Sequence, residues 1–211
     1  LDDSNKPFYR WFAGGVVNTC YNAVDRHADG GRGDQAAIIY DSPITGTQRT
    51  ITYAELKDQT ARFGGVLRGL GVAKGDRVIL YMPMVPETVT AFLAVIGIGA
   101  IALPLFSGYA APALVTRLVD AEAKAVVTAD GFVRRGRLVP MKPIVDEALA
   151  ACPGVERTVV LRYAGNPVSM ISSTLGHADE STVDEYLATD GHRMRQCAIG
   201  LAGIELTGVL I

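Results

Sequence analysis

The chain has 211 residues, a length that fits one large α/β domain, and its composition of 49% hydrophobic and 20% charged residues excludes intrinsic disorder. Twenty Lys and Arg residues face 22 Asp and Glu residues, so the formal net charge of −2 excludes a chain-wide positive field that would collect nucleic acid. Three widely separated cysteines, Cys20, Cys152 and Cys197, favour a reducing compartment over a disulfide framework, and we expect a cytoplasmic protein. The sequence begins without an initiator Met or a recognisable signal peptide, which indicates a trimmed start.

The amino-terminal third predicts a wrapping segment and a hairpin. Residues 1–33 are rich in aromatic residues and glycines without clear periodicity, except for a short helix expected near Asn18–His27. Two β-rich runs follow, at Ala36–Tyr40 and Arg49–Tyr53. The segment between them contains a proline and a glycine, which favour turn geometry, so we predict a β-hairpin.

A helix is expected directly after the hairpin. Thr52 and Glu55 have the spacing of a capping box, in which both side chains bond to free N–H groups at a helix start. Apolar residues then recur at three- and four-residue spacing as far as Leu70. Gly71 is placed to end the helix in the left-handed conformation.

Short apolar strands then alternate with helices. The predicted strands are Arg77–Met82, Ile101–Phe106, Lys124–Ala129 and Arg157–Arg162, and the predicted helices are Pro86–Ile98, Ala110–Ala121 and Pro140–Ala151. Strands that are apolar on both faces are typical of a parallel sheet covered by helices. We therefore predict an α/β fold with a doubly wound, mainly parallel sheet and helices on both faces, preceded by the wrapping segment and the hairpin.

One uncharged stretch and the tail need separate interpretation. Thr88–Leu103 has 16 residues, fewer than the roughly 20 that a membrane span needs, so we predict a buried helix and strand and no membrane partner. Beyond residue 170 the character of the sequence changes, and we divide the chain into 1–170 and an unassigned tail, 171–211. The tail ends in the apolar stretch Ile199–Ile211, through which we expect self-association.

Most catalytic templates are absent from the sequence. It contains no C-x-x-C or H-E-x-x-H motif, and its three histidines lack ligand spacing, so we predict no metal site. It contains no G-x-S-x-G or S-x-x-K motif and no Gly-Lys dipeptide, which excludes a nucleophile elbow and a Walker A loop. We therefore assign no catalytic residue within the chain.

A dinucleotide fingerprint occurs in the wrong context. Gly97, Gly99 and Ala102 match the pattern G-x-G-x-x-A, whose glycines allow a pyrophosphate to approach a helix start. Here the pattern ends a predicted helix and leads into a predicted strand. An NAD-binding enzyme is therefore a distant alternative, and close packing between helix and strand is the favoured interpretation.

The most informative segment is the predicted loop Ala129–Arg137, between a strand and a helix. Arg134, Arg135 and Arg137 place three guanidiniums within four residues, and their mutual repulsion must be relieved by solvent or by an anion. Open α/β sheets bind ligands at the carboxyl ends of their strands, where this loop is expected. The residue types leave two interpretations open: a phosphate-binding loop and a solvated basic loop.

A series of short segments occurs in a fixed order along residues 1–168. They are Phe8-Tyr-Arg-Trp-Phe12, Asn18-Thr-Cys-Tyr-Asn22, Asp25-Arg-His27, Arg32-Gly-Asp34, Thr52-Tyr-Ala-Glu-Leu56, Lys74-Gly-Asp76, Tyr81-Met-Pro-Met84, Arg117-Leu-Val-Asp120, Thr128-Ala-Asp130, Arg134–Arg137 and Asp146-Glu-Ala-Leu149. In order and spacing, this set resembles the acetyl- and propionyl-CoA synthetases of the adenylate-forming superfamily.

The resemblance implies a reaction and a partial site. In that family an acid and ATP, with magnesium, form an acyl-adenylate and pyrophosphate, and the CoA thiol then displaces AMP. The segment that matches the family's binding site for the 3′-phosphate end of CoA comprises Arg134, Arg135, Gly136 and Arg137. Phe106, Ser107 and Gly108 match a segment beside the bound CoA that the family usually writes Phe-Gly-Gly-Phe, from which Ser107 and Tyr109 depart.

Other parts of the family pattern are not found. The ATP phosphate loop, the acyl-pocket tryptophan and the catalytic lysine of the family have no counterpart in the sequence. We therefore expect an amino-terminal portion of a short-chain acyl-CoA synthetase that is inactive alone. The alternative is a non-catalytic module that binds CoA or a protein partner.

Overall fold

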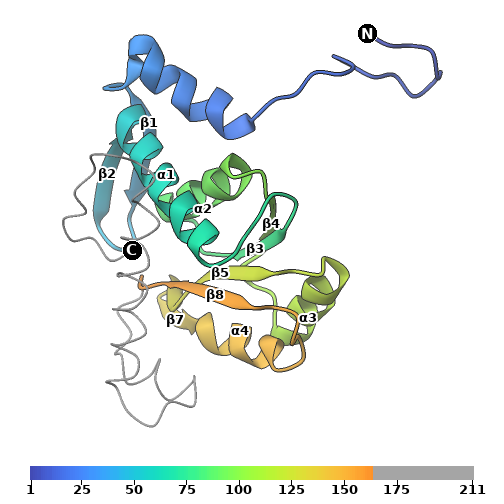
Figure 1. Cartoon of the computed structure of the whole chain (residues 1–211). Coiled ribbons are helices and arrows are strands. Elements are labelled where there is room, and N and C mark those ends of the chain that lie inside the picture. The colour runs from blue at the N-terminus through green and yellow to red at the C-terminus, as the bar shows by residue number, and fades with distance from the viewer. Residues whose placement is uncertain (164–211) are drawn as a thin grey trace.

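A computed structural model describes residues 1–163 of the chain (Figure 1). Its centre is a four-stranded parallel sheet in the order β4-β3-β5-β8, formed by β3 (Arg77–Tyr81), β4 (Ile101–Leu105), β5 (Ala125–Ala129) and β8 (Arg157–Leu161). β5 is buried along its whole length, as expected for an apolar strand with neighbours on both sides and helices on both faces. All four predicted strands are confirmed. The predictions made for the tail lie outside the described residues.

The helices cover both faces of this sheet. They are α1 (Tyr53–Gly69), α2 (Pro86–Gly97), α3 (Ala111–Asp120) and α4 (Lys142–Leu149). The connection from β3 through α2 to β4 runs in one direction along the sheet, and the connection from β5 through α4 to β8 runs in the other. Because parallel crossovers are right-handed, opposite directions place these helices on opposite faces. Figure 1 shows α1 and α2 on one side and α3 and α4 on the other, which confirms the doubly wound fold.

The amino-terminal segment divides into two parts. Residues 18–32 hold two short helical segments, η1 (Tyr21–Asp25) and η2 (Ala28–Arg32), which pack against α1, and Asn18 Nδ2 donates to Gly97 O at the end of α2 (3.0 Å). Residues 1–17 instead extend away from the sheet (Figure 1), with the side chain of Trp11 71% exposed. The wrapping predicted for all of residues 1–33 is thus found for residues 18–32.

The predicted hairpin and capping box are both confirmed. β1 (Ala36–Ser42) and β2 (Thr47–Thr52) pair antiparallel beside α1. At the start of α1, Glu55 N donates to Thr52 Oγ1 (3.2 Å), and Thr52 N donates to Glu55 Oε2 (2.7 Å). Gly71, just beyond the end of the helix, has a φ of +89°, which glycine adopts without the steric cost that a Cβ atom would add.

Replacing Thr60 by valine should stabilise the fold. Thr60 lies on α1 with 5% of its surface exposed, and its Oγ1 has no hydrogen-bond partner among the described residues. Valine has a similar shape and removes the unpaired hydroxyl, so the free energy of unfolding should rise by about 1 kcal/mol. Urea titration measures this change. Thr116→Val, at an exposed position on α3, is the matched control and should shift stability by less than about 0.5 kcal/mol.

The two glycines of the apparent dinucleotide fingerprint have packing roles. Gly97 is the last residue of α2, and Gly99 has a φ of +82° in the turn that leads to β4. A Cβ atom on Gly99 would lie 3.1 Å from Lys74 Cγ, so the turn also requires close approach. The pattern therefore ends a helix, as its sequence context indicated.

In the part of the chain that the structure describes, no helix combines the length and the apolar character needed to cross a membrane.

One predicted element is wrong. The segment Ala129–Arg137 was expected to be a loop, but most of it forms a β-hairpin of β6 (Gly131–Arg134) and β7 (Arg137–Pro140). The hairpin projects from the carboxyl end of β5 and leads into α4. Its strands are only four residues long, and their pairing sets Arg134 opposite Arg137.

Candidate functional site

The topology directs attention to one edge of the sheet. β3 and β5 are neighbours, and their connections leave in opposite directions, which makes the carboxyl ends of these strands a topological switch point. Two segments lie at this edge: residues 106–109, which follow β4, and the β6–β7 hairpin, which follows β5. These are the two segments in which all seven predicted site residues occur.

The hairpin places two arginine residues directly opposite each other. Arg134 and Arg137 are the pair that closes the hairpin, directly opposite each other in the antiparallel register. Directly opposed residues project from the same face with Cβ atoms about 4.5 to 5.5 Å apart. Both residues are exposed, and no carboxylate within residues 1–163 forms an ion pair with either. Two like charges opposed in this way are unfavourable without an anion between them.

The turn that joins the two strands is under conformational constraint. Arg135 has a φ of +53° and Gly136 a φ of +72°. Two consecutive positive φ values are those of a type I′ turn, whose twist matches that of the flanking strands. Glycine accepts this conformation readily, whereas an arginine there is uncommon. The turn residues thus serve to align Arg134 with Arg137.

The loop after β4 contacts the hairpin. The Cζ atom of Arg134 lies 5.9 Å from the centroid of the Phe106 ring, within the range of a cation–π contact. A Cβ atom on Gly108 would lie 2.5 Å from Phe106 Cε1 and 3.2 Å from Arg134 Nη1. Only a residue without a side chain allows both groups to remain where they are. The structure therefore brings Arg134 next to Phe106 and Gly108, from which it is 28 and 26 residues away in the sequence.

Tyr81, which was not among the predicted site residues, holds the loop 106–109 from the sheet side. It is fully buried at the end of β3, and its hydroxyl donates towards Tyr109 O (2.8 Å) and Ser107 O (3.0 Å). Burial raises the pKa of Tyr81, so the hydroxyl stays protonated and remains a donor. Ser107 thus contributes its carbonyl to this contact. In the sequence, Tyr81 appeared as a tyrosine at the end of an apolar strand and as part of the family resemblance, and neither signal gave it this role.

Arg117 and Tyr109 complete the surroundings of Phe106. The Phe106 and Tyr109 rings meet edge to face with centroids 5.7 Å apart, and Arg117 Cζ lies 4.1 Å from the centroid of the Tyr109 ring. Arg117 Nη1 also donates to Ala113 O (2.8 Å), which fixes the guanidinium to the surface of α3. Arg117 was noted only as part of the family resemblance, because its contact with Tyr109 depends on the loop conformation.

Asp130 fixes the base of the hairpin. Its side chain is 1% exposed, and Oδ1 accepts hydrogen bonds from Gly131 N (2.8 Å) and Tyr163 N (2.9 Å). The backbone oxygen of Asp130 accepts a bond from Met141 N (3.1 Å), at the other end of the hairpin. One residue thus joins both hairpin strands to the chain that follows β8.

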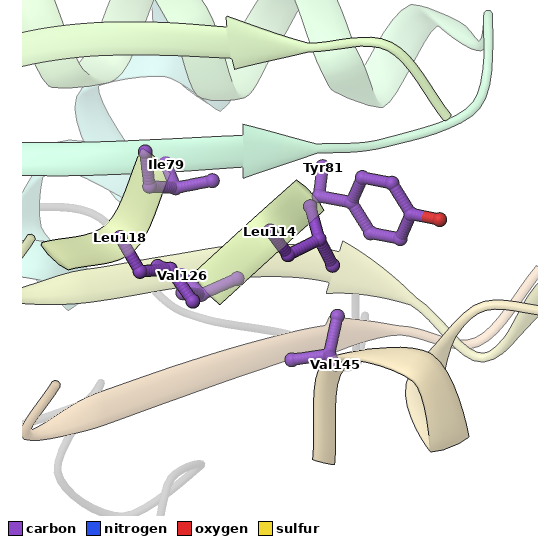
Figure 2. Close-up of a pocket in the computed structure, with 6 residues that line it drawn as sticks. All are labelled: Ile79, Tyr81, Leu114, Leu118, Val126 and Val145. Atoms are coloured by element: carbon purple, nitrogen blue, oxygen red, sulfur yellow. The ribbon is translucent and has the colours of Figure 1, made fainter. Parts of the chain in front are cut away.

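The apolar pocket nearby belongs to the core. Figure 2 shows the side chains that line it: Ile79, Tyr81, Leu114, Leu118, Val126 and Val145. All six are buried, and they come from β3, β5, α3 and α4. The Tyr81 hydroxyl points away from the other five side chains. This region packs the sheet against its helices and carries no polar group suited to a ligand.

Other reactive groups in the described chain do not form a second site. Burial, with the Asp25 carboxylate nearby, raises the pKa of the Cys20 thiol to about 11, so it is not a thiolate at neutral pH. Within residues 1–163, no three His, Cys, Asp or Glu side chains are grouped so that they could hold a metal ion. The candidate site is therefore the one at the carboxyl edge of the sheet.

The fold is that of a doubly wound α/β protein, a class that binds ligands at the carboxyl ends of its strands. A family model described as AMP-binding enzyme matches residues 24–193, and a model described as the acetyl-coenzyme A synthetase N-terminus matches residues 1–23. The chain belongs to the AMP-binding enzyme family. The resemblance found in the sequence is thereby confirmed, whereas the domain boundary at residue 170 stays a prediction.

Curated relatives agree with this assignment. An acetyl-coenzyme A synthetase of Streptomyces avermitilis is 48% identical over 169 residues, which are 80% of this chain and 26% of the relative. The enzyme of the same name from Mycolicibacterium smegmatis is 47% identical over 165 residues, 78% of this chain and 18% of the relative. That of Methanothrix soehngenii is 43% identical over 171 residues, 81% of this chain and 25% of the relative. The chain thus spans about a quarter or less of the length of these relatives.

Proposed function

We propose that this chain is the CoA-binding part of a short-chain acyl-CoA synthetase, which converts an acid, ATP and CoA into acyl-CoA, AMP and pyrophosphate. Family membership and the names of the relatives support the reaction class. Acetate is the favoured acid because the relatives are acetyl-CoA synthetases, with propionate as the second candidate. We assign no residue of 1–163 to ATP, magnesium or the acid.

The observation that carries the proposal is the opposed pair Arg134 and Arg137. Guanidiniums bind phosphate oxygens through paired, charge-assisted hydrogen bonds, and two arginines opposed on one face of the hairpin suit the doubly charged 3′-phosphate of CoA. The exposed ring of Phe106, beside Arg134, offers a surface on which the adenine can stack. Together, these groups can recognise the two parts of CoA that distinguish it from pantetheine.

Calorimetric titration of the full 211-residue chain tests the proposal. CoA should bind at least several-fold more tightly than dephospho-CoA, because only CoA carries the 3′-phosphate that the arginines would bind. The preference should shrink as salt is added, since the pair is exposed and its attraction is screened. Equal affinity for CoA and dephospho-CoA would restore the interpretation of the hairpin as a solvated basic surface. The chain alone should not catalyse acetate-dependent exchange of pyrophosphate into ATP, because the family's ATP phosphate loop has no counterpart in the sequence. Clear acetate-dependent exchange would contradict the expectation that the chain is inactive alone.

Replacing Gly108 by alanine should weaken CoA binding while the fold stays intact. The new methyl group would lie 2.5 Å from Phe106 Cε1, so the ring must move, and Arg134 with it. The ring is the end of a flexible, exposed side chain, so it can move without loss of core packing. We expect an affinity loss of about tenfold, of the order of one base–aromatic contact. The matched control is Gly65→Ala on α1, where no atom lies within 4 Å of the added Cβ, and it should bind CoA normally.

A further inference from the structure

We propose that Arg117 is a positioning residue for the CoA site: through the ring of Tyr109 it holds Phe106, and thereby Arg134, in the orientation that the ligand meets. This inference rests on the proposed function, since it concerns the same site. The four side chains form one continuous series, Arg117–Tyr109–Phe106–Arg134, that runs from α3 across the loop after β4 to the β6–β7 hairpin.

The first step of the series is the best defined. Arg117 Cζ lies 4.1 Å from the Tyr109 ring centroid, a close stacking distance for a guanidinium. Arg117 Nη1 donates to Ala113 O, one helical turn earlier, and this hydrogen bond orients the guanidinium independently of the ring. Within residues 1–163, Arg117 forms no ion pair, and its guanidinium lies against the Tyr109 ring.

The second contact of the series is that between the Tyr109 ring and the Phe106 ring, which would face the ligand. Tyr109 meets Phe106 edge to face at 5.7 Å, an arrangement that aromatic pairs prefer. The chain turns between them, since Tyr109 N donates to Phe106 O (3.1 Å). Phe106 is 59% exposed and is not held by the core, so the Tyr109 ring is its lateral support. Loss of that support should leave the Phe106 ring free to rotate out of position.

Tyr81 supports the same turn through the backbone. Its hydroxyl bonds to the carbonyls of Ser107 and Tyr109, whereas Arg117 acts on the Tyr109 side chain. The loop is therefore held at two independent points, one below the backbone and one beside the ring. Removal of Arg117 alone should loosen the rings without releasing the turn from the sheet. A measurable change of ligand affinity in a folded protein is the expected result.

The test uses variants of the full chain with and without CoA. Arg117→Met keeps the apolar stem and removes the guanidinium, and Tyr109→Leu removes the ring, so each should weaken CoA binding about threefold to tenfold. Tyr109→Phe should bind as the parent does, because the contacts require only the ring. The double variant Arg117→Met with Tyr109→Leu should be no weaker than the worse single variant, since both act through one contact. Arg68→Met, an exposed arginine in the last turn of α1, is the control.

Hydrogen exchange without ligand separates this inference from the proposed function. Peptides that cover residues 104–110 should exchange faster in Arg117→Met and Tyr109→Leu than in the parent, and at the parental rate in Tyr109→Phe and Arg68→Met. If the parent chain fails to bind CoA, the proposed function fails, but this pattern of exchange still decides the positioning role. Unchanged exchange in Arg117→Met, or additive losses of affinity in the double variant, would overturn the inference.

Discussion

Replacing Arg134 and Arg137 together by alanine should reduce CoA binding by more than about a hundredfold, because each guanidinium–phosphate pair contributes roughly 1.5 to 3 kcal/mol as a charged hydrogen bond. The two residues oppose each other at the end of the hairpin, so a single phosphate can contact both. Dephospho-CoA should lose much less affinity, since it lacks the group that the arginines meet. Calorimetric titration of the parent and the double variant with both ligands measures the difference.

The matched control removes the same charge elsewhere. Arg68, on α1, and Arg157, at the amino end of β8, are exposed arginines away from the carboxyl edge of the sheet. Their double alanine variant should retain CoA binding within about twofold, since charges beyond a Debye length of about 8 Å are screened at physiological salt. A loss of equal size in both double variants would mean that net charge, rather than the opposed pair, governs affinity. The phosphate site at the hairpin would then be rejected.

Without ligand, replacement of Arg134 and Arg137 should not destabilise the hairpin. The opposed guanidiniums repel each other, and no described carboxylate relieves that repulsion. Their removal therefore leaves the hairpin no less stable while it removes the ligand's contacts. A pair of like charges that destabilises its own hairpin, and whose repulsion a bound anion would relieve, is typical of a binding site rather than of a structural element.

Local sequence signals were sufficient for the elements of the sheet. β5 and α2 are apolar stretches whose lengths, 5 and 12 residues, are typical of a strand and of a helix. α1 begins at a capping box whose two hydrogen bonds are both formed. Their order along the chain implies a parallel sheet, because each strand must return through a helix to pair in the same direction. These features depend on residues close together in sequence, and the fold class followed from them.

The β6–β7 hairpin could not be predicted in the same way. Its strands have four residues each, and its turn is Arg135-Gly136 rather than the Asn-Gly or Asp-Gly that marks a two-residue hairpin. The basic character of the segment was visible, but the opposition of Arg134 and Arg137 requires the register of the pairing. The site was therefore predicted as a set of residues and not as a geometry.

The supporting residues were hidden for a different reason. Tyr81 bonds to backbone carbonyls 26 and 28 residues away, and Arg117 contacts a ring across the start of α3. No local periodicity encodes a side chain that holds the backbone of a distant loop. Such contacts become visible only when the topology places β3, the loop after β4 and α3 together.

Replacing Leu114 by alanine should destabilise the chain by about 2 to 5 kcal/mol, the usual cost of truncating a fully buried leucine. Leu114 is 2% exposed and lies on α3 between the sheet and α4, where Ile79, Val126 and Val145 surround it (Figure 2). These neighbours come from three different elements, β3, β5 and α4, so they cannot all move to fill the space, and a cavity remains. Urea titration should show a lower midpoint with an unchanged slope.

Val119→Ala is the control on the same helix. Val119 is 59% exposed on the outer face of α3, so its truncation removes little buried surface and should change stability by less than about 0.5 kcal/mol. Valine is a weaker helix former than leucine, so Val119→Ala gains more helix propensity than Leu114→Ala, and the difference between the two variants is an upper estimate of the packing contribution. Equal effects at Leu114 and Val119 would mean that α3 does not pack on the sheet as described. The position of α3, which carries Arg117 and follows the loop 106–109, would then have to be revised.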